Sequence, residues 1–282
     1  MKSINHLPAF LLYKIFKFIN AKKVIADFII TEKNLNEDEK AEKYFLYELK
    51  KAPKFDKLHQ QQVSGKTVLE IGSGFGGYVC HLLKSGSAFV IGIDTDEHRV
   101  QKNKLLIDKY YYGDNYTIRD CDACDLNFLK SGSIDFVVSD AAIEHIFHRQ
   151  KMFKEINRVL KSDGLAFLST SPIWFTWNGG HLMRYIPLPW GHLLLPDKII
   201  FQILELQKQH ADFPKRAIND MIILYQTIGK LSIRKLKREI KCSGLKLIKF
   251  ENISNNSIKR VLVKLPILEE LFAGNIQVLL KK

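Results

Sequence analysis

Short apolar runs alternate with longer segments of helical periodicity over the middle of the chain. The runs are rich in Val, Ile, Leu and Phe, and the segments between them repeat apolar residues every three or four positions. This alternation predicts an α/β fold, in which helices cover both faces of a parallel sheet. The predicted strands are 66–71, 88–93, 116–122, 134–139 and 165–170, and the predicted helices end near 83 and span 95–109 and 149–160.

The two ends of the chain depart from this alternation. Residues 7–30 have the pattern of a basic amphipathic helix or helix pair, and Asn36 with three acidic residues after it marks a further helix that stops before Pro53. We therefore expect an N-terminal helical extension over 1–63 and one main domain over 64–282. Near the C-terminus the pattern predicts a helix at 232–242 and strands at 245–252 and 276–282.

Residues 171–230 interrupt the pattern after the fifth predicted strand and hold five of the eight prolines and all three tryptophans. Ligands of open α/β sheets bind beyond the carboxyl ends of the strands, so this insertion is expected to cover the site as a substrate lid. Its aromatic side chains could line an apolar pocket or form a second small core, and the two roles are compatible. These residues are Trp174, Phe175, Trp177, Tyr185 and Trp190.

The composition is that of a globular protein, with 282 residues of which 46% are hydrophobic and 26% charged. Four cysteines are too few for a disulfide scaffold, so a reducing, cytoplasmic setting is expected. No run reaches the roughly 18 uncharged apolar residues of a membrane span. The longest apolar stretch near the start, Ala9–Tyr13, is shorter than a signal-peptide core.

The net charge of +13 belongs to the two ends of the chain. Residues 61–199 are neutral, whereas 1–60 carry +4 and 200–282 carry +9. A basic end can meet nucleic acid or anionic lipid, but a solvated lysine-rich surface has the same composition. Since no nucleic-acid-binding signature is present, we expect no specific nucleic-acid partner. Peripheral membrane contact through the basic N-terminal helix stays open.

A glycine-rich turn follows the first strand of the α/β region. Residues 68–77 read VLEIGSGFGG, so the strand carries Glu70, and Gly72, Gly74 and Gly76 follow at alternate positions. Such glycines let the backbone approach a ligand closely before the next helix begins. A tight strand–helix turn without a ligand uses the same residues, so the loop alone does not define a site.

Two acidic residues extend the pattern along the following strands. Asp94 ends the second predicted strand, 22 residues after Gly72, where an ionised carboxylate can accept two hydrogen bonds from a ribose diol. Asp122-Ala123 ends the third strand, and an acid there can meet the exocyclic amine of an adenine. The spacing therefore predicts a nucleoside cofactor along three strand ends.

Together with Asp135-Phe136, Glu144-His145 and Leu160-Lys161-x-x-Gly164, these motifs resemble the class I S-adenosylmethionine-dependent methyltransferases, in the small-molecule branch called type 11. The resemblance implies S-adenosyl-L-methionine as cofactor and a Rossmann-like, seven-stranded, mostly parallel sheet whose last strand is antiparallel. It implies that Glu70 helps to hold the cofactor's amino group, Asp94 the ribose hydroxyls and Asp122 the adenine amine. The predicted cofactor-binding set is Glu70, Gly72, Ser73, Gly74, Gly76, Asp94, Thr95, Asp122 and Ala123. Asp140, where relatives more often carry a neutral residue, receives no role.

Three histidines are candidate general bases: His145 after the fourth strand, and His181 and His192 in the insertion. Histidine titrates near physiological pH and can accept a proton from an acceptor hydroxyl. Positioning of the reactants supplies much of the rate of such a reaction, so a base is helpful rather than required. Each histidine also has a structural alternative, in packing or hydrogen bonding.

The sequence thus predicts methyl transfer to a small molecule, with oxygen preferred as the acceptor atom. Gly-Gly-His181 and Pro-Trp-Gly-His192 resemble spacings in methyltransferases of natural-product and cell-surface glycan pathways. The alternatives are methylation of RNA or protein guided by the basic C-terminal third, a catalytically silent cofactor-binding interaction protein, and a nicotinamide oxidoreductase, which the loop spacing disfavours. No metal is expected, because Cys121 and Cys124 lack a second pair.

Overall fold

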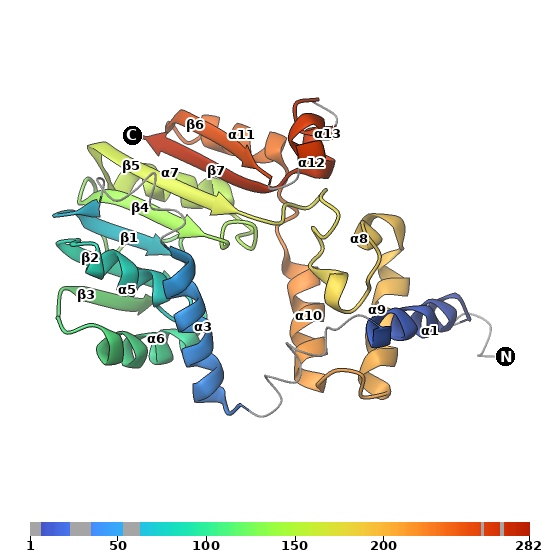
Figure 1. Ribbon diagram of the computed structural model, residues 1–282. Helices are drawn as coiled ribbons and strands as arrows, with labels where there is room; N and C mark the ends of the chain where they lie inside the picture. The colour runs from blue at the N-terminus through green and yellow to red at the C-terminus, as the bar shows by residue number, and fades with distance from the viewer. Residues whose placement is uncertain (1–6, 23–34, 53–62, 255–256, 266–267) are drawn as a thin grey trace. The chain divides into compact units, whose positions relative to one another are not determined.

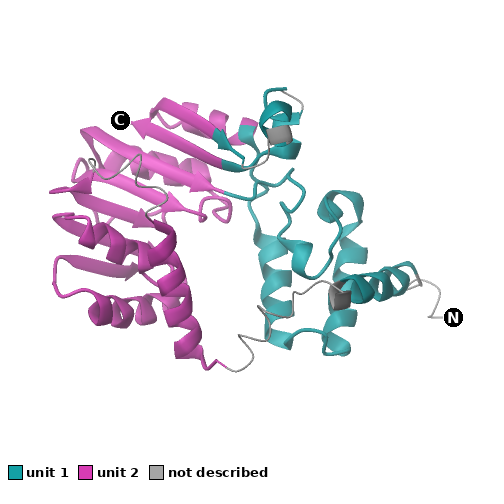
Figure 2. Cartoon of the chain, viewed as in Figure 1, with its two compact units in different colours: residues 1–34, 171–233, 252–275 teal, residues 35–170, 234–251, 276–282 magenta. Residues whose placement is uncertain are grey.

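The structure is a computed structural model that describes residues 7–22, 35–52, 63–254, 257–265 and 268–282. The chain forms two compact units, coloured separately in Figure 2. Unit 1 comprises residues 1–34, 171–233 and 252–275, and unit 2 comprises 35–170, 234–251 and 276–282. Residues 23–30 of the predicted N-terminal helix pair lie outside the described part of the chain.

Unit 2 is built on a seven-stranded sheet in the order β3-β2-β1-β4-β5-β7-β6 (Figure 1). The first five strands pair in parallel, and β7 runs antiparallel to β5. From β1 the chain adds β2 and β3 on one side, and it then returns to place β4 and β5 on the other side of β1. The direction of winding therefore reverses between β1 and β4. Open α/β sheets bind ligands at such a point. The strands are β1 (Thr67–Ile71), β2 (Phe89–Asp94), β3 (Tyr116–Asp120), β4 (Ile134–Asp140), β5 (Leu160–Thr170), β6 (Lys246–Ile253) and β7 (Asn275–Lys281).

The central strands are buried on both faces, as their continuous apolar runs require. Residues 68–71 of β1 are all buried, including Glu70. One face packs against α3 (Glu37–Lys51), α5 (Gly77–Lys84) and α6 (Glu97–Tyr110), with Phe45, Val79 and Ile107 among its core residues. On the opposite face lie α7 (Arg149–Val159) and α11 (Ile233–Lys241) (Figure 1).

Unit 1 is helical and has its own core. Its elements are α1 (Leu7–Lys22), the short helix η3 (Leu182–Arg184), α8 (Gly191–Leu194), α9 (Asp197–Gln209), α10 (Lys215–Thr227), α12 (Ser257–Leu262) and α13 (Leu268–Phe272). Tyr13 and Phe16 of α1 pack with Trp174, Leu204 of α9 and Tyr225 of α10. The two predicted N-terminal helices consequently belong to different units, α1 to unit 1 and α3 to unit 2.

Several element boundaries differ from the sequence-based expectation. β5 begins at Leu160 instead of residue 165, because Leu160 already has extended backbone and pairs with Ile134. β3 ends at Asp120, so Asp122 lies in the turn beyond the strand. The predicted start of α3 after Asn36 is confirmed, and it forms a capping box: the Asn36 side chain accepts from the Glu39 N–H, and the Glu39 carboxylate accepts from the Asn36 N–H.

Candidate functional site

The glycine loop between β1 and α5 is held by backbone hydrogen bonds to the end of β2. The N–H groups of Gly72 and Ser73 both donate to the Ile93 carbonyl, at 2.8 and 2.9 Å. Gly76 has a φ of +91°, which disfavours any residue with a Cβ, and a Cβ there would lie 2.2 Å from Asn103 Oδ1. The fully buried Asn103 of α6 donates from Nδ2 to the carbonyl of Gly74 at 3.2 Å. The loop is therefore fixed from two sides.

Helix α3 closes the third side of the loop. The Glu48 carboxylate accepts hydrogen bonds from the backbone N–H groups of Gly77, at 3.1 Å, and Phe75. A Cβ on Gly77 would lie 2.2 Å from the Phe45 carbonyl oxygen, so only glycine lets the two helices approach this closely. The Phe75 ring stacks on Tyr44 of α3. The start of α5 thus depends on a helix that precedes the α/β region in the sequence.

Four carboxylates gather around this loop. Glu70 is 3% exposed, and its Oε2 has no hydrogen-bond partner among the described residues. Burial, together with Glu48, Asp140 and Asp94, raises the pKa of Glu70 well above its usual range. Burial likewise raises the pKa of Glu48 to about 7, against the lowering effect of its two backbone hydrogen bonds.

One cation balances part of this negative charge. Lys51 of α3 forms an ion pair with Asp140 at the end of β4, with Nζ 2.6 Å from Oδ2. Asp140 Oδ1 is also buried and has no hydrogen-bond partner among the described residues. A buried carboxylate without a partner is costly, and a cationic ligand would lower that cost. The four carboxylates around the glycine loop could therefore bind a positively charged group of a ligand.

Asp94 lies at the carboxyl end of β2 and anchors the loop. Its Oδ2 accepts from the Gly74 N–H at 2.9 Å, and its Oδ1 accepts from the Asp96 N–H at 3.0 Å. Each carboxylate oxygen can accept a further hydrogen bond, so the group keeps acceptor capacity for a ligand hydroxyl. The neighbouring Thr95 is exposed.

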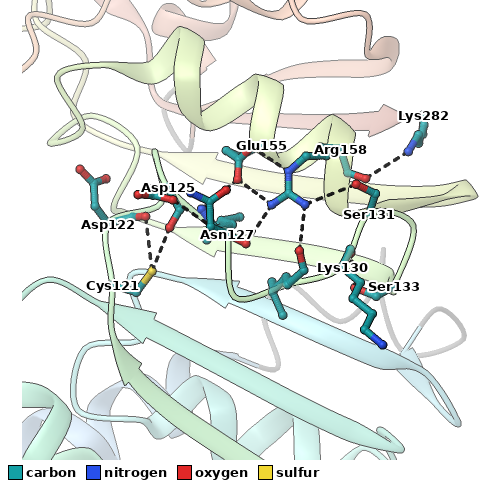
Figure 3. A network of polar contacts seen from close by, with 12 residues as sticks. Cys121, Asp122, Asp125, Asn127, Lys130, Ser131, Ser133, Glu155, Arg158 and Lys282 are labelled. Carbon is teal, nitrogen blue, oxygen red and sulfur yellow. Dashed lines mark hydrogen bonds and ion pairs between the residues drawn. The ribbon is translucent and has the colours of Figure 1, made fainter.

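Asp122 and Ala123 lie in the segment that follows β3. Asp122 is exposed and its Oδ1 accepts from the Cys124 N–H at 2.8 Å, while Ala123 is buried. A clamp of α7 residues holds the segment, as Figure 3 shows. Arg158 pairs with Glu155 in two hydrogen bonds, of 2.8 and 2.7 Å, and donates to the carbonyls of Leu126 and Leu129. Glu155 in turn accepts from the Leu126 N–H at 2.8 Å.

His145 stands in the turn that follows β4, in the same unit as the loop and its carboxylates. The side chain is exposed, but desolvation by nearby protein atoms lowers its pKa, and Arg99 adds to that effect. The imidazole is consequently neutral near pH 7 and able to accept a proton. The preceding Glu144 is buried and accepts from the Thr170 hydroxyl at 2.7 Å, which fixes the turn against the end of β5.

His181 and His192 lie in unit 1. His181 has a φ of +58° and precedes η3. His192 is buried, with Nε2 2.5 Å from the Trp174 carbonyl oxygen and its ring edge-on to the Trp174 ring. Burial lowers the pKa of His192, and the neutral ring must carry its proton on Nε2 to donate to that carbonyl. Its catalytic role stays a prediction, as do those of His145 and His181.

Three residues of the site were not predicted from the sequence, namely Glu48, Lys51 and Asn103, and Asp140 was given no role there although it belongs to the carboxylate cluster. Asn103 had a signal, because it shares the buried stripe of α6 with Leu106 and Ile107 at helical spacing. A polar residue on an apolar stripe is informative, since it must find a partner inside. Glu48 and Lys51 had none, because the packing of α3 on α5 is a tertiary contact.

Comparisons with known proteins agree with this geometry. Residues 69–168 match the family model of a methyltransferase domain. The chain is 30% identical over 108 residues to a sterol 24-C-methyltransferase of Pneumocystis carinii, covering 38% of this chain and 28% of that protein. It is 25% identical over 152 residues to a ubiquinone biosynthesis O-methyltransferase of Bradyrhizobium diazoefficiens, covering 51% of this chain and 58% of that protein. The chain thus spans from about a quarter to somewhat over half of these relatives' length.

Solved structures share the fold at low identity. A Mesorhizobium loti S-adenosylmethionine-dependent methyltransferase superposes with a TM-score of 0.52 at 17% identity, covering 78% of this chain and 93% of that chain. A geranyl diphosphate methyltransferase in complex with GPP and sinefungin gives 0.54 at 13%, covering 82% and 76%. The [4+2]-cyclase SpnF also gives 0.54, at 10% identity, covering 83% and 80%.

The sheet topology, with the glycine loop at its centre, is that of open α/β domains, which bind ligands at this point of the sheet. Residues 69–168 match the methyltransferase-domain family, and the fold is that of S-adenosylmethionine-dependent methyltransferases, in agreement with the resemblance of the sequence motifs. S-adenosylmethionine carries a sulfonium and an ammonium group, and the partnerless buried oxygens of Glu70 and Asp140 fit such a ligand. No group of three or more metal-ligating side chains occurs within the described ranges.

Proposed function

We propose that this protein transfers the methyl group of S-adenosylmethionine to an oxygen of a small molecule. The observation that carries the proposal is the cluster of Glu70, Asp94, Glu48 and Asp140 around the glycine loop of a methyltransferase domain. When bound, the cofactor supplies a methyl group on a sulfonium, which is already an excellent leaving group.

The residues of unit 2 would bind and orient the cofactor. Glu70 would hold the ammonium group, Asp94 the ribose hydroxyls, and Asp122 with Ala123 the adenine. Glu48 and Asn103 would not contact the cofactor themselves but would hold the glycine loop in place for it. His145, neutral near pH 7, would accept the proton that the acceptor hydroxyl loses.

Unit 1 would bind the acceptor as the substrate lid. Its aromatic residues divide into two groups: Trp174 and Tyr185 are buried in the core of the unit, whereas Phe175 and Trp177 are 39% and 36% exposed. Partly exposed aromatic side chains of this kind can cover an apolar ligand. The curated relatives that the chain matches are named for sterol and ubiquinone biosynthesis, which is consistent with an apolar acceptor.

We place the reaction in natural-product or cell-surface glycan biosynthesis, in the cytoplasm. The test is formation of S-adenosylhomocysteine from S-adenosylmethionine when a polyprenyl phenol, a sterol, geranyl diphosphate or a glycan is added. A phenol or sugar hydroxyl as the methylated group would support the proposal, and mass spectrometry of the product identifies the atom. Turnover with only an RNA or a protein would overturn the small-molecule assignment, and cofactor binding with no turnover on any of them would favour a silent interaction protein.

A further inference from the structure

Helix α1 has two apolar faces, although only one of them packs inside unit 1. The buried face carries Ala9, Tyr13 and Phe16, which are at most 3% exposed and pack in the core that includes residues of α9 and α10. Leu12 and Ile19, which are partly buried, also pack against this core. The opposite face of α1 is exposed, although the helix itself is packed on unit 1.

That opposite face exposes four large apolar side chains. Phe10 is 42% exposed, Leu11 61%, Ile15 44% and Phe18 60%. Leu11, Ile15 and Phe18 follow Phe10 by one, five and eight positions, which places all four along one side of a helix. Lys14 belongs to the same side, and its Nζ lies 5.2 Å from the centre of the Phe10 ring. We call these five residues the α1 outer face.

The charge of α1 has a single sign. Residues 7–22, LPAFLLYKIFKFINAK, contain three lysines and no acidic residue. Lys17 is engaged by Asp212 at 2.5 Å at the edge of the buried face, whereas Lys14 contacts aromatic rings. Over its whole sequence, unit 1 carries a net charge of +7. The outer face thus combines aromatic and aliphatic groups with positive charge.

These features fit the boundary of an anionic lipid bilayer. There the apolar side chains reach the acyl region while lysine ammonium groups stay with the headgroup phosphates. A second copy of this chain fits less well, because a two-fold contact would bring the same cationic face against itself without an acid to pair with it. None of the described helices is long and apolar enough to cross a membrane, so the helix would lie in the plane of the surface.

We propose that the α1 outer face docks unit 1 onto an anionic lipid surface. This goes beyond the proposed methyl transfer and does not depend on it, because none of the five residues belongs to the cofactor site. A protein that binds no cofactor would still dock.

The test is co-sedimentation of the full chain with vesicles of phosphatidylcholine alone or mixed with phosphatidylglycerol. The wild type is expected to bind the mixed vesicles, weakly bind the neutral ones, and lose affinity as salt is added. The double variant Leu11→Ser, Phe18→Ser should weaken binding at least about tenfold, and Lys14→Glu should weaken it specifically on anionic vesicles. Circular dichroism confirms that each variant keeps its helices.

The matched control is Leu105→Ser on α6, since Leu105 is 64% exposed but lies in unit 2. Leu105→Ser should bind the vesicles like the wild type. Asp94→Ala should do so too, because lipid binding does not depend on the proposed methyltransferase activity. Equal binding by the wild type and the double variant, or no binding to anionic vesicles, would overturn the proposal. So would self-association that the double variant abolishes in sedimentation velocity, which would assign the face to a second copy.

Discussion

The carboxylate of Glu48, on a helix that precedes the α/β region, lies 3.1 Å from the backbone nitrogen of Gly77 at the start of α5. Gly77 could not carry a side chain there, because the backbone of α3 passes too close. The glycines of this loop therefore also serve the packing of α3 and α6, because a Cβ on Gly77 would meet the backbone of α3 and a Cβ on Gly76 would meet Asn103.

Glu48 is expected to make the stability of the protein depend on pH. Burial raises its pKa from the usual 4.5 of a glutamate to about 7, so folding favours the protonated form. The stability tied to this group is fully present below about pH 4.5 and is lost as pH rises through about 7, by up to about 3 kcal/mol. Urea unfolding of the wild type and Glu48→Gln between these limits measures the difference.

The Gln variant should lose less stability than the wild type over this pH range. Glu205→Gln, at a half-exposed site of α9, serves as the control and should follow the wild type. Parallel curves for the wild type and Glu48→Gln would show that Glu48 does not titrate in this window.

The buried ion pair between Arg149 and Glu239 is expected to be essential for folding. Arg149 Nε lies 2.9 Å from Glu239 Oε2, and the two side chains are 0% and 5% exposed. Glu239→Ala leaves a buried cation without its partner, which costs about 3–5 kcal/mol. Asp163→Ala, which breaks the exposed pair with Lys281, should leave the urea midpoint unchanged.

Replacing both Arg149 and Glu239 distinguishes the cost of an uncompensated buried charge from that of lost packing. Arg149→Met with Glu239→Leu should recover most of the stability, because apolar side chains of similar size need no charge partner. If the double variant is as unstable as Glu239→Ala, the uncompensated charge is not the cause.

Arg158 is expected to control the order of the segment that carries Asp122. Arg158→Lys keeps the charge but loses the planar, two-bond pairing with Glu155 and the bonds to two carbonyls. Hydrogen exchange over residues 121–133 should become at least about tenfold faster, as about 1.4 kcal/mol of local stability is lost. Arg216→Lys on the exposed face of α10 is the control, and unchanged exchange in Arg158→Lys would refute the clamp.

Much of the fold could be predicted from the sequence, because strands and helix starts are encoded by residues that are close together in the chain. All seven strands were expected within a few residues of their observed bounds, apart from the early start of β5 at Leu160. The start of α3 was encoded in Asn36 and Glu39, whose mutual hydrogen bonds involve neighbours in the sequence. The number of strands and the antiparallel direction of the last one followed from the family resemblance.

The elements that were missed have weaker or longer-range signals. Helices α9 and α10 lie in the insertion, for which no helix was predicted, although Ile200, Ile203 and Leu204 recur at helical spacing and are buried in α9. The short helices α12 and α13 have too few residues for a periodic pattern. The role of Glu48 depends on tertiary packing, which no local pattern records.

Calorimetric titration with S-adenosylmethionine tests the central claim most directly, using the wild type, Asp94→Ala and Asp94→Asn, with the exposed Asp114→Ala as control. The wild type and Asp114→Ala should bind one cofactor per chain. Asp94→Ala should bind about 10- to 100-fold more weakly, as expected for lost hydrogen bonds to a charged group. Asp94→Asn should fall between them, because its amide oxygen can still accept from the Gly74 N–H. No binding by the folded wild type, or equal affinity in Asp94→Ala, would contradict the proposed cofactor site.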